Sequence, residues 1–190
     1  MKSICVFCGS NPGHNPIYKE AAVELASNIV SNKYKLVYGG GKLGLMGIIA
    51  NYVLDHETPV LGVIPKTLSS EQLLRLTDEQ LVLTNSISDR IQYMVDASDA
   101  LVVLPGGFGT MEELSSVLCW SELSLHNKPI VLMNINGYFD KYISFLQNAV
   151  EEGFLVEANY RLLKVATSTE EAFREINLYQ HNVAFKHLSN

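Results

Sequence analysis

The sequence is poor in cysteine and carries no excess of positive charge, and each shortage excludes a class of protein. Three cysteines in 190 residues are too few and too odd a set for a disulfide framework, and such a set is typical of a reducing compartment. The net charge of -6 disfavours non-specific binding to nucleic acid or to an anionic membrane surface. We therefore expect neither a nucleic acid polymer nor a membrane as a partner.

Long apolar runs and metal-ligand patterns are also missing. No apolar run approaches the roughly 18 residues that span a membrane. The N-terminal apolar stretch is too short for a secretion signal and leads directly into a predicted strand. The five histidines show no metal-ligand spacing. The sequence also contains no recognisable Ser-His-Asp or Cys-His pattern for nucleophilic catalysis. We expect a cytoplasmic protein that uses no metal and no cofactor.

Cys5 and Cys8 form a C-x-x-C pattern inside the first predicted strand. A redox C-x-x-C normally lies at the start of a helix. The odd spacing places the two side chains on opposite faces of a strand. We interpret them as buried thiols.

Strands and helices alternate along the whole chain. Helix starts are marked by Asn15 before Pro16 and by Ser168 or Thr169, and the tail from Tyr179 is expected to be ordinary or frayed. The apolar runs predict strands at 3–8, 35–38, 59–64, 81–84, 100–104, 129–133 and 162–166. Helices are predicted at 15–32, 44–56, 70–76, 86–98, 110–125, 138–152 and 168–177.

The predicted strands are rich in Val, Ile and Leu and show no polar alternation. This composition is typical of a parallel sheet that helices cover on both faces. The fold class is therefore α/β, a Rossmann-like doubly wound parallel sheet, and we expect a single domain over residues 1–190.

Glycine-containing loops follow three of the predicted strands. The carboxyl ends of parallel strands meet at one edge of a sheet, where such folds bind ligands. A nucleotide is therefore expected to contact Gly9, Ser10, Gly40 and Gly41.

The glycines at 39, 41 and 44 match the dinucleotide pattern G-x-G-x-x-G. The pattern follows the second strand, however, and no acidic residue lies about 20 positions further on. Leu43 after Lys42 excludes a P-loop. Close packing of a helix on a strand is the alternative role for these glycines.

The stretch from Pro105 to Glu113 reads as a strand end, a glycine loop and a helix start. Its backbone N–H groups, beside the positive end of a helix, suit a phosphate. Thr110 and Glu113 also match a capping box, so a purely structural role for Glu113 remains open. A carboxylate in a first helical turn favours its ionised form.

Arg90 is expected in the first turn of its helix. There the helix dipole disfavours a cation, and an exposed, solvated arginine is the simpler interpretation. Met94 follows four residues later on the same helix face, so the two side chains could together meet a base or sugar.

The segment PGGFGTMEE at 105–113 resembles the PGGxGTxxE signature of the Lonely Guy (LOG) family. Members of this family are cytokinin riboside 5′-monophosphate phosphoribohydrolases, which were long labelled lysine decarboxylases. The resemblance covers nearly the whole chain and includes VFCGS at 6–10, VYGGG at 37–41, GLMG at 44–47, GVIPK at 62–66 and AVEEGF at 149–154.

The resemblance implies hydrolysis of the N-glycosidic bond of a nucleoside 5′-monophosphate to free base and ribose 5-phosphate. It implies catalytic roles for Arg90 and Glu113, and substrate contacts for Glu112 and Gln72. It also implies a homodimer, for which the helices at 86–98 and 110–125 are the natural interface. The phosphate site implied by the resemblance consists of Gly106, Gly107, Gly109 and Thr110.

Four positions depart from the family pattern around the base and ribose. Ile91 stands where the family has lysine, Ser88 where it has histidine, Gln72 where it has glutamate and Cys119 where it has threonine. These departures predict an altered base preference, for example toward AMP.

Two further functions remain open at the level of sequence: a non-catalytic nucleotide-binding protein, and a carrier of a phosphorylated cofactor such as the molybdenum cofactor. A lysine decarboxylase is disfavoured, because no pyridoxal-phosphate lysine site is legible.

Overall fold

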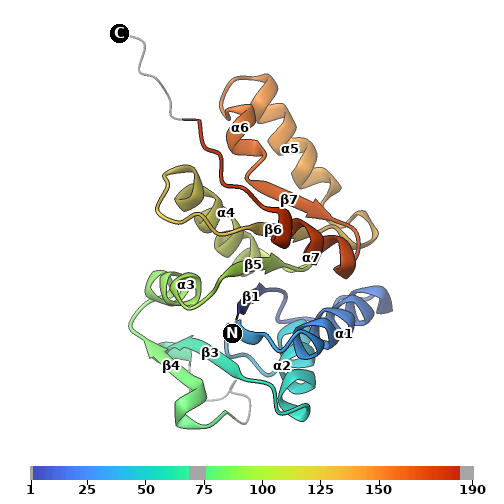
Figure 1. The fold of residues 1–190 in the computed structure, drawn as a ribbon, viewed down its shortest axis with the longest axis vertical. Helices are drawn as coiled ribbons and strands as arrows, with labels where there is room; N and C mark the ends of the chain where they lie inside the picture. The colour runs from blue at the N-terminus through green and yellow to red at the C-terminus, as the bar shows by residue number, and fades with distance from the viewer. Residues whose placement is uncertain (1, 69–75, 185–190) are drawn as a thin grey trace.

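The computed structural model describes residues 2–68 and 76–184, and Figure 1 shows its alternation of strands and helices. The strands are β1 (Ser3–Phe7), β2 (Lys35–Tyr38), β3 (Val60–Pro65), β4 (Leu81–Thr84), β5 (Ala100–Val103), β6 (Ile130–Met133) and β7 (Leu163–Ala166). The helices are α1 (Pro16–Ser31), α2 (Gly44–Asp55), α3 (Ile87–Asp96), α4 (Phe108–Glu122), α5 (Asp140–Glu151), α6 (Glu157–Tyr160) and α7 (Thr169–Leu178).

All seven strands form one parallel sheet in the order β4-β3-β2-β1-β5-β6-β7. In Figure 1 the sheet runs from β4 near the bottom to β7 near the top. The chain builds outward from β1 to β4, returns to the other side of β1, and builds outward again from β5 to β7. The predicted doubly wound α/β fold is confirmed, and its topological switch point lies between β1 and β5.

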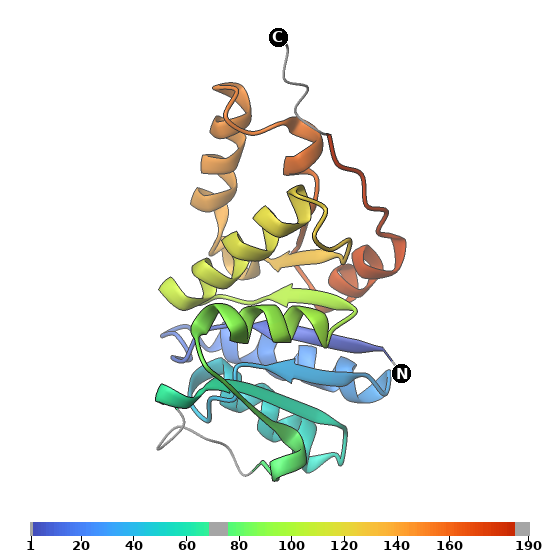
Figure 2. The ribbon, with the colours of Figure 1, turned by 90° about the vertical axis from the view of Figure 1, so that its left-hand side faces the viewer.

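Helices cover the sheet on both faces, as the apolar strands predict. One buried cluster packs α1, α2 and α7 against the sheet, and a second packs α3, α4 and α5 against the opposite face. Figure 2 shows α3 and α4 in front of the strands, with α1 and α2 behind. Cys8 belongs to the first cluster and Cys5 to the second, so these thiols face opposite sides, as predicted.

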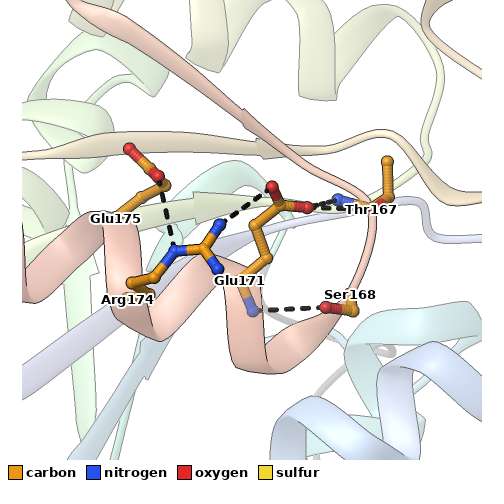
Figure 3. Close-up of polar contacts among 5 residues, drawn as sticks. All are labelled: Thr167, Ser168, Glu171, Arg174 and Glu175. Atoms are coloured by element: carbon orange, nitrogen blue, oxygen red, sulfur yellow. Dashed lines mark hydrogen bonds and ion pairs between the residues drawn. The ribbon is translucent and has the colours of Figure 1, made fainter.

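Two helix starts follow from local sequence. The Asn15 side chain accepts a hydrogen bond from the Ile17 N–H at 3.1 Å, and Ser168 Oγ accepts one from the Glu171 N–H at 3.2 Å. Figure 3 shows the carboxylate of Glu171 turning back to accept from Thr167. Each pair satisfies donors that a helix start leaves free.

The structure adds features that the sequence patterns do not predict. The short helix α6 is one of them. The chain beyond Tyr179 is not frayed as far as residue 184, because the Ala184 N–H donates to Asn159 Oδ1 at 3.0 Å. Most of the predicted helix at 70–76 lies outside the described residues. Among the helices that are described, none is long and apolar enough to cross a membrane.

Candidate active site

A cavity of about 470 Å³ opens at the carboxyl ends of β1 and β5, at the switch point. Most of its wall comes from three segments: the loop after β1, the first residues of α2, and the loop after β5. Backbone hydrogen bonds join them, from the Gly9 N–H to the Pro105 carbonyl and from the Leu45 N–H to the Gly9 carbonyl, each at 3.0 Å. The predicted convergence of glycine loops is confirmed for the loops after β1 and β5.

The helix α4 begins inside the glycine loop, two residues before the predicted start. Gly107 is its N-cap, and the first helical hydrogen bond runs from the Met111 N–H to the Gly107 carbonyl at 3.0 Å. The backbone N–H groups of Phe108, Gly109 and Thr110 therefore have no partner within the helix. These donors lie at the positive end of a 15-residue helix, an arrangement that suits an anion.

The predicted capping box at Thr110 and Glu113 is wrong. Thr110 lies within the first turn and is almost fully buried, so it does not occupy the N-cap position. A Cβ on Gly106 would lie 2.0 Å from Thr110 Oγ1. The glycine at 106 is therefore required for the close approach of this threonine to the loop.

Arg90 and Glu113 form an ion pair beside this loop. Arg90 Nη1 lies 2.9 Å from Glu113 Oε1, and the two side chains are 16% and 7% exposed. Arg90 Nε also donates to the Val63 carbonyl at 3.0 Å. A Cβ on Gly39 would lie 2.0 Å from Arg90 Nη2, so the missing side chain at 39 makes room for the guanidinium. The interpretation of Arg90 as an exposed, solvated arginine is wrong.

Helical periodicity explains why Glu113 points inward. The buried residues of α4 include Thr110, Glu113, Leu114 and Val117, which follow the i, i+3, i+4, i+7 spacing of a core-facing stripe. A carboxylate on such a stripe has to find a partner or give up its charge. The position of Glu113 on this apolar stripe was therefore a signal in the sequence that its side chain is buried and needs a partner.

Burial raises the pKa of Glu113 from 4.5 to about 7, although the neighbouring Arg90 charge and hydrogen bond lower it. The expectation of a carboxylate kept ionised by the helix start is therefore wrong. Glu113 lies in the second turn, and the loss of water outweighs the helix dipole there. A carboxyl group that titrates near neutrality can accept or hold a proton under physiological conditions.

The residues of the glycine loops that were predicted to contact a ligand divide into two groups. Gly9 and Ser10 line the cavity. Gly40 and Gly41 are buried and are not part of its wall. A Cβ on Gly44 would lie 2.3 Å from the backbone of Ser10, so this glycine allows α2 to approach the loop after β1. Close packing, the alternative role considered for these glycines, describes Gly44.

The other predicted substrate contacts lie away from the cavity or outside the described residues. Met94 is fully buried in the core between α3 and the sheet, so it shares no exposed surface with Arg90. Glu112 is exposed on α4 and does not line the cavity. Gln72 lies outside the described residues.

Several cavity residues were not singled out from the sequence, notably Met46, Tyr18 and Tyr138. Tyr138 follows the loop after β6, next to the switch point in the sheet order. The rule that ligands bind at the carboxyl ends of strands could have found it. Within residues 2–68 and 76–184, no cluster of three or more His, Cys, Asp or Glu side chains could hold a metal ion.

Comparison with known proteins identifies the family of the chain. Residues 46–176 match the family described as "Possible lysine decarboxylase". The chain is 42% identical over 179 residues to the probable cytokinin riboside 5′-monophosphate phosphoribohydrolase LOG6 of Arabidopsis thaliana, covering 94% of this chain and 89% of that one. It is 40% identical over 179 residues to the probable cytokinin riboside 5′-monophosphate phosphoribohydrolase LOGL3 of Oryza sativa subsp. japonica, covering 94% of this chain and 85% of that one.

Among solved structures, the molybdenum cofactor binding protein of Rippkaea orientalis is similar with a TM-score of 0.69 and 20% identity, covering 93% of this chain and 96% of that one. At this identity the similarity shows the shared fold alone. The family match and the relatives of about 40% identity are more specific. The chain therefore belongs to the Lonely Guy (LOG) family.

Proposed function

We propose that this protein hydrolyses the N-glycosidic bond of a purine nucleoside 5′-monophosphate, of the cytokinin type or AMP, to free base and ribose 5-phosphate. The observation that carries the proposal is the buried Arg90–Glu113 pair beside a helix start with free N–H groups, in one cavity. Relatives of about 40% identity are named phosphoribohydrolases, which supports the same reaction.

The phosphate end of the substrate is proposed to lie on the loop from Gly106 to Thr110. Gly107 and Gly109 have open space where a side chain would stand, so a phosphate can approach the backbone N–H groups closely. Binding energy from a phosphate remote from the reacting bond can hold the ribose in place for the reaction.

The reacting end is proposed to lie at Arg90 and Glu113. The bond between ribose C1′ and the base nitrogen breaks, water adds its hydroxyl group to C1′, and the base leaves with a proton. The ribose develops oxocarbenium character. The ionised form of Glu113, which predominates only above its raised pKa of about 7, stabilises that charge and orients the water. Arg90 stabilises the negative charge that develops on the departing base.

Base preference is proposed to differ from the family pattern. Ile91, at the position of the family lysine, is 2% exposed and packs in the core, so its side chain offers no charge to a substrate. Ser88 and Cys119 are exposed. None of these three side chains is among the residues that line the cavity, so the proposed change in base preference rests on their departure from the family pattern.

The direct test is to incubate the purified protein with AMP, isopentenyladenosine monophosphate and other nucleoside monophosphates, and to assay ribose 5-phosphate. The proposal expects release from at least one purine nucleotide and loss of turnover in Glu113→Gln with the fold retained. No release from any nucleotide would overturn it. Nucleotide binding without release would favour the non-catalytic alternative.

We further propose that the protein is a cytoplasmic homodimer. Exposed apolar side chains on α3 and at the end of α4, Ile87, Tyr93, Leu123 and Leu125, support an interface over these two helices. The three cysteines are all unpaired, which is compatible with a reducing compartment. Sedimentation analysis of the wild type and of Tyr93→Asp distinguishes a dimer from a monomer, and a wild-type monomer would contradict the proposed interface.

A further inference from the structure

Tyr138 makes a direct contact with the proposed phosphate loop. Its hydroxyl donates a hydrogen bond to the Gly106 carbonyl oxygen at 2.7 Å. This carbonyl belongs to the peptide group that joins Gly106 to Gly107. In a planar trans peptide the N–H points opposite to the carbonyl, and no described peptide bond is cis. The hydroxyl of Tyr138 therefore sets the direction of the Gly107 N–H as well.

A peptide between two glycines needs such a restraint. Glycine reaches backbone conformations that are closed to other residues, so two successive glycines do not by themselves restrict the orientation of the peptide group between them. A Cβ on Gly107 would meet no atom within 4 Å, so close packing does not hold the residue. The Gly9 N–H holds the preceding carbonyl, that of Pro105, which leaves the next peptide group to Tyr138.

Side-chain hydrogen bonds of Asn134 hold the loop after β6 that carries Tyr138. The Asn134 side chain donates to Asp140 Oδ1 at 2.7 Å and accepts from the Phe139 N–H at 2.8 Å. Between them, Asn136 and Gly137 have φ angles of 53° and 69°, in the left-handed region that asparagine and glycine tolerate best.

The ring of Tyr138 is held between two other aromatic rings. Its centroid lies 5.7 Å from that of Tyr18 at an interplanar angle of 76°, and 4.8 Å from that of Phe139 at 90°. Both contacts are of the favourable edge-to-face kind. They depend on the ring alone, so removal of the hydroxyl leaves them in place.

We propose that Tyr138 is a positioning residue that fixes the orientation of the Gly106–Gly107 peptide group and thereby sets the affinity of the site for the 5′-phosphate. The inference rests on the proposed function for the identity of the anion. Tyr138 acts on the substrate through the loop, so it controls binding of the phosphate-bearing half and not the cleavage of the glycosidic bond.

The test compares Tyr138→Phe with the wild type and with Tyr142→Phe. Tyr142 lies one turn further along the chain and packs against the core. The substitution Tyr142→Phe likewise removes one hydroxyl and leaves the ring in place. Calorimetric titration with ribose 5-phosphate measures phosphate-dependent binding without a cleavable bond. The loss of one hydrogen bond predicts a rise in Kd of roughly three- to tenfold in Tyr138→Phe, and less than twofold in Tyr142→Phe.

Turnover provides a second measurement. The KM for a nucleoside monophosphate should rise by a similar factor in Tyr138→Phe while kcat stays within about twofold, since the lost interaction is the same in ground state and transition state. Adenosine, which lacks the phosphate, should bind equally well to both proteins. Replacement of Tyr138 by 4-aminophenylalanine restores a donor and should restore most of the affinity for ribose 5-phosphate.

The outcomes separate this inference from the proposed function. If the wild type binds ribose 5-phosphate but cleaves no nucleotide, the proposed function fails and the calorimetric comparison still decides the role of Tyr138. An unchanged Kd in Tyr138→Phe, an equal loss of adenosine affinity, or no binding of ribose 5-phosphate to the wild type overturns the inference. The unfolding midpoints of the variants verify that each is folded.

Discussion

Glu113→Gln should make the folded protein more resistant to unfolding at alkaline pH, although it removes a proposed catalytic group. Burial raises the pKa of Glu113 from 4.5 to about 7, so the folded state keeps a proton that the unfolded state releases. Between these two pH values the folded state binds more protons, and the free energy of unfolding falls as the pH rises. Above pH 7 the whole penalty is present.

The size of the effect follows from the shift. At 1.36 kcal/mol for each pH unit, the displacement corresponds to roughly 3 kcal/mol. Glutamine is neutral at every pH and preserves the shape of the side chain and an oxygen for Arg90. The variant should therefore match the wild type near pH 4.5 and exceed it by roughly 3 kcal/mol at pH 8, which corresponds to about 6–12 °C in Tm for a chain of this size.

Urea unfolding of both proteins at several values between pH 4.5 and 8 measures the difference. Histidines also titrate in this range, but both proteins contain them, so they cancel when the curves are subtracted. Glu24→Gln, at an exposed carboxylate on α1 that is not among the groups shifting the pKa of Glu113, is the matched control and should run nearly parallel to the wild type. Parallel curves for Glu113→Gln and the wild type, or a less stable Gln variant at pH 8, would refute the reasoning.

Three further substitutions or treatments test other parts of the structure. Gly39→Ala should displace the Arg90 guanidinium and thereby lower kcat/KM by at least about tenfold. The free energy of unfolding in urea should change little, because Gly39 has no positive φ. Unchanged turnover would contradict the proposed role of Arg90. Ser168→Ala should lower the free energy of unfolding by about 1 kcal/mol through the lost cap, which corresponds to a drop of about 2–4 °C in Tm. A calorimetric Tm within about 1 °C of the wild type would contradict this role of Ser168. A thiol reagent should label only exposed Cys119 in the native protein, as mass spectrometry can check, because the other two thiols are buried and burial raises their pKa.

Much of the fold could be predicted from short stretches of sequence. The strands around Val102 and Val131 are apolar on both faces, which only a covered sheet satisfies. Asn15 and Ser168 cap their helices because the cap and the donor it binds are two and three residues apart. The glycine loops follow strands, and in a parallel sheet this is enough to bring those after β1 and β5 to one edge.

The chemistry of the candidate site depended on contacts that no local pattern contains. Arg90 meets Glu113 through the packing of α3 and α4 on the same face of the sheet. Its guanidinium also needs the empty space at Gly39, which directly follows β2. The shift in the pKa of Glu113 comes from burial, a property of the packed core.

Tyr138 shows the same division between sequence and structure. Its sequence neighbours Asn136 and Gly137 are recognisable turn residues, and the turn is present. The Tyr138 hydroxyl reaches the Gly106 carbonyl, 32 residues earlier in the chain. This contact follows only from the adjacent positions of β5 and β6 in the sheet. Local chemistry determined which loops could bind a nucleotide, and long-range packing decided which side chains face it and in which protonation state.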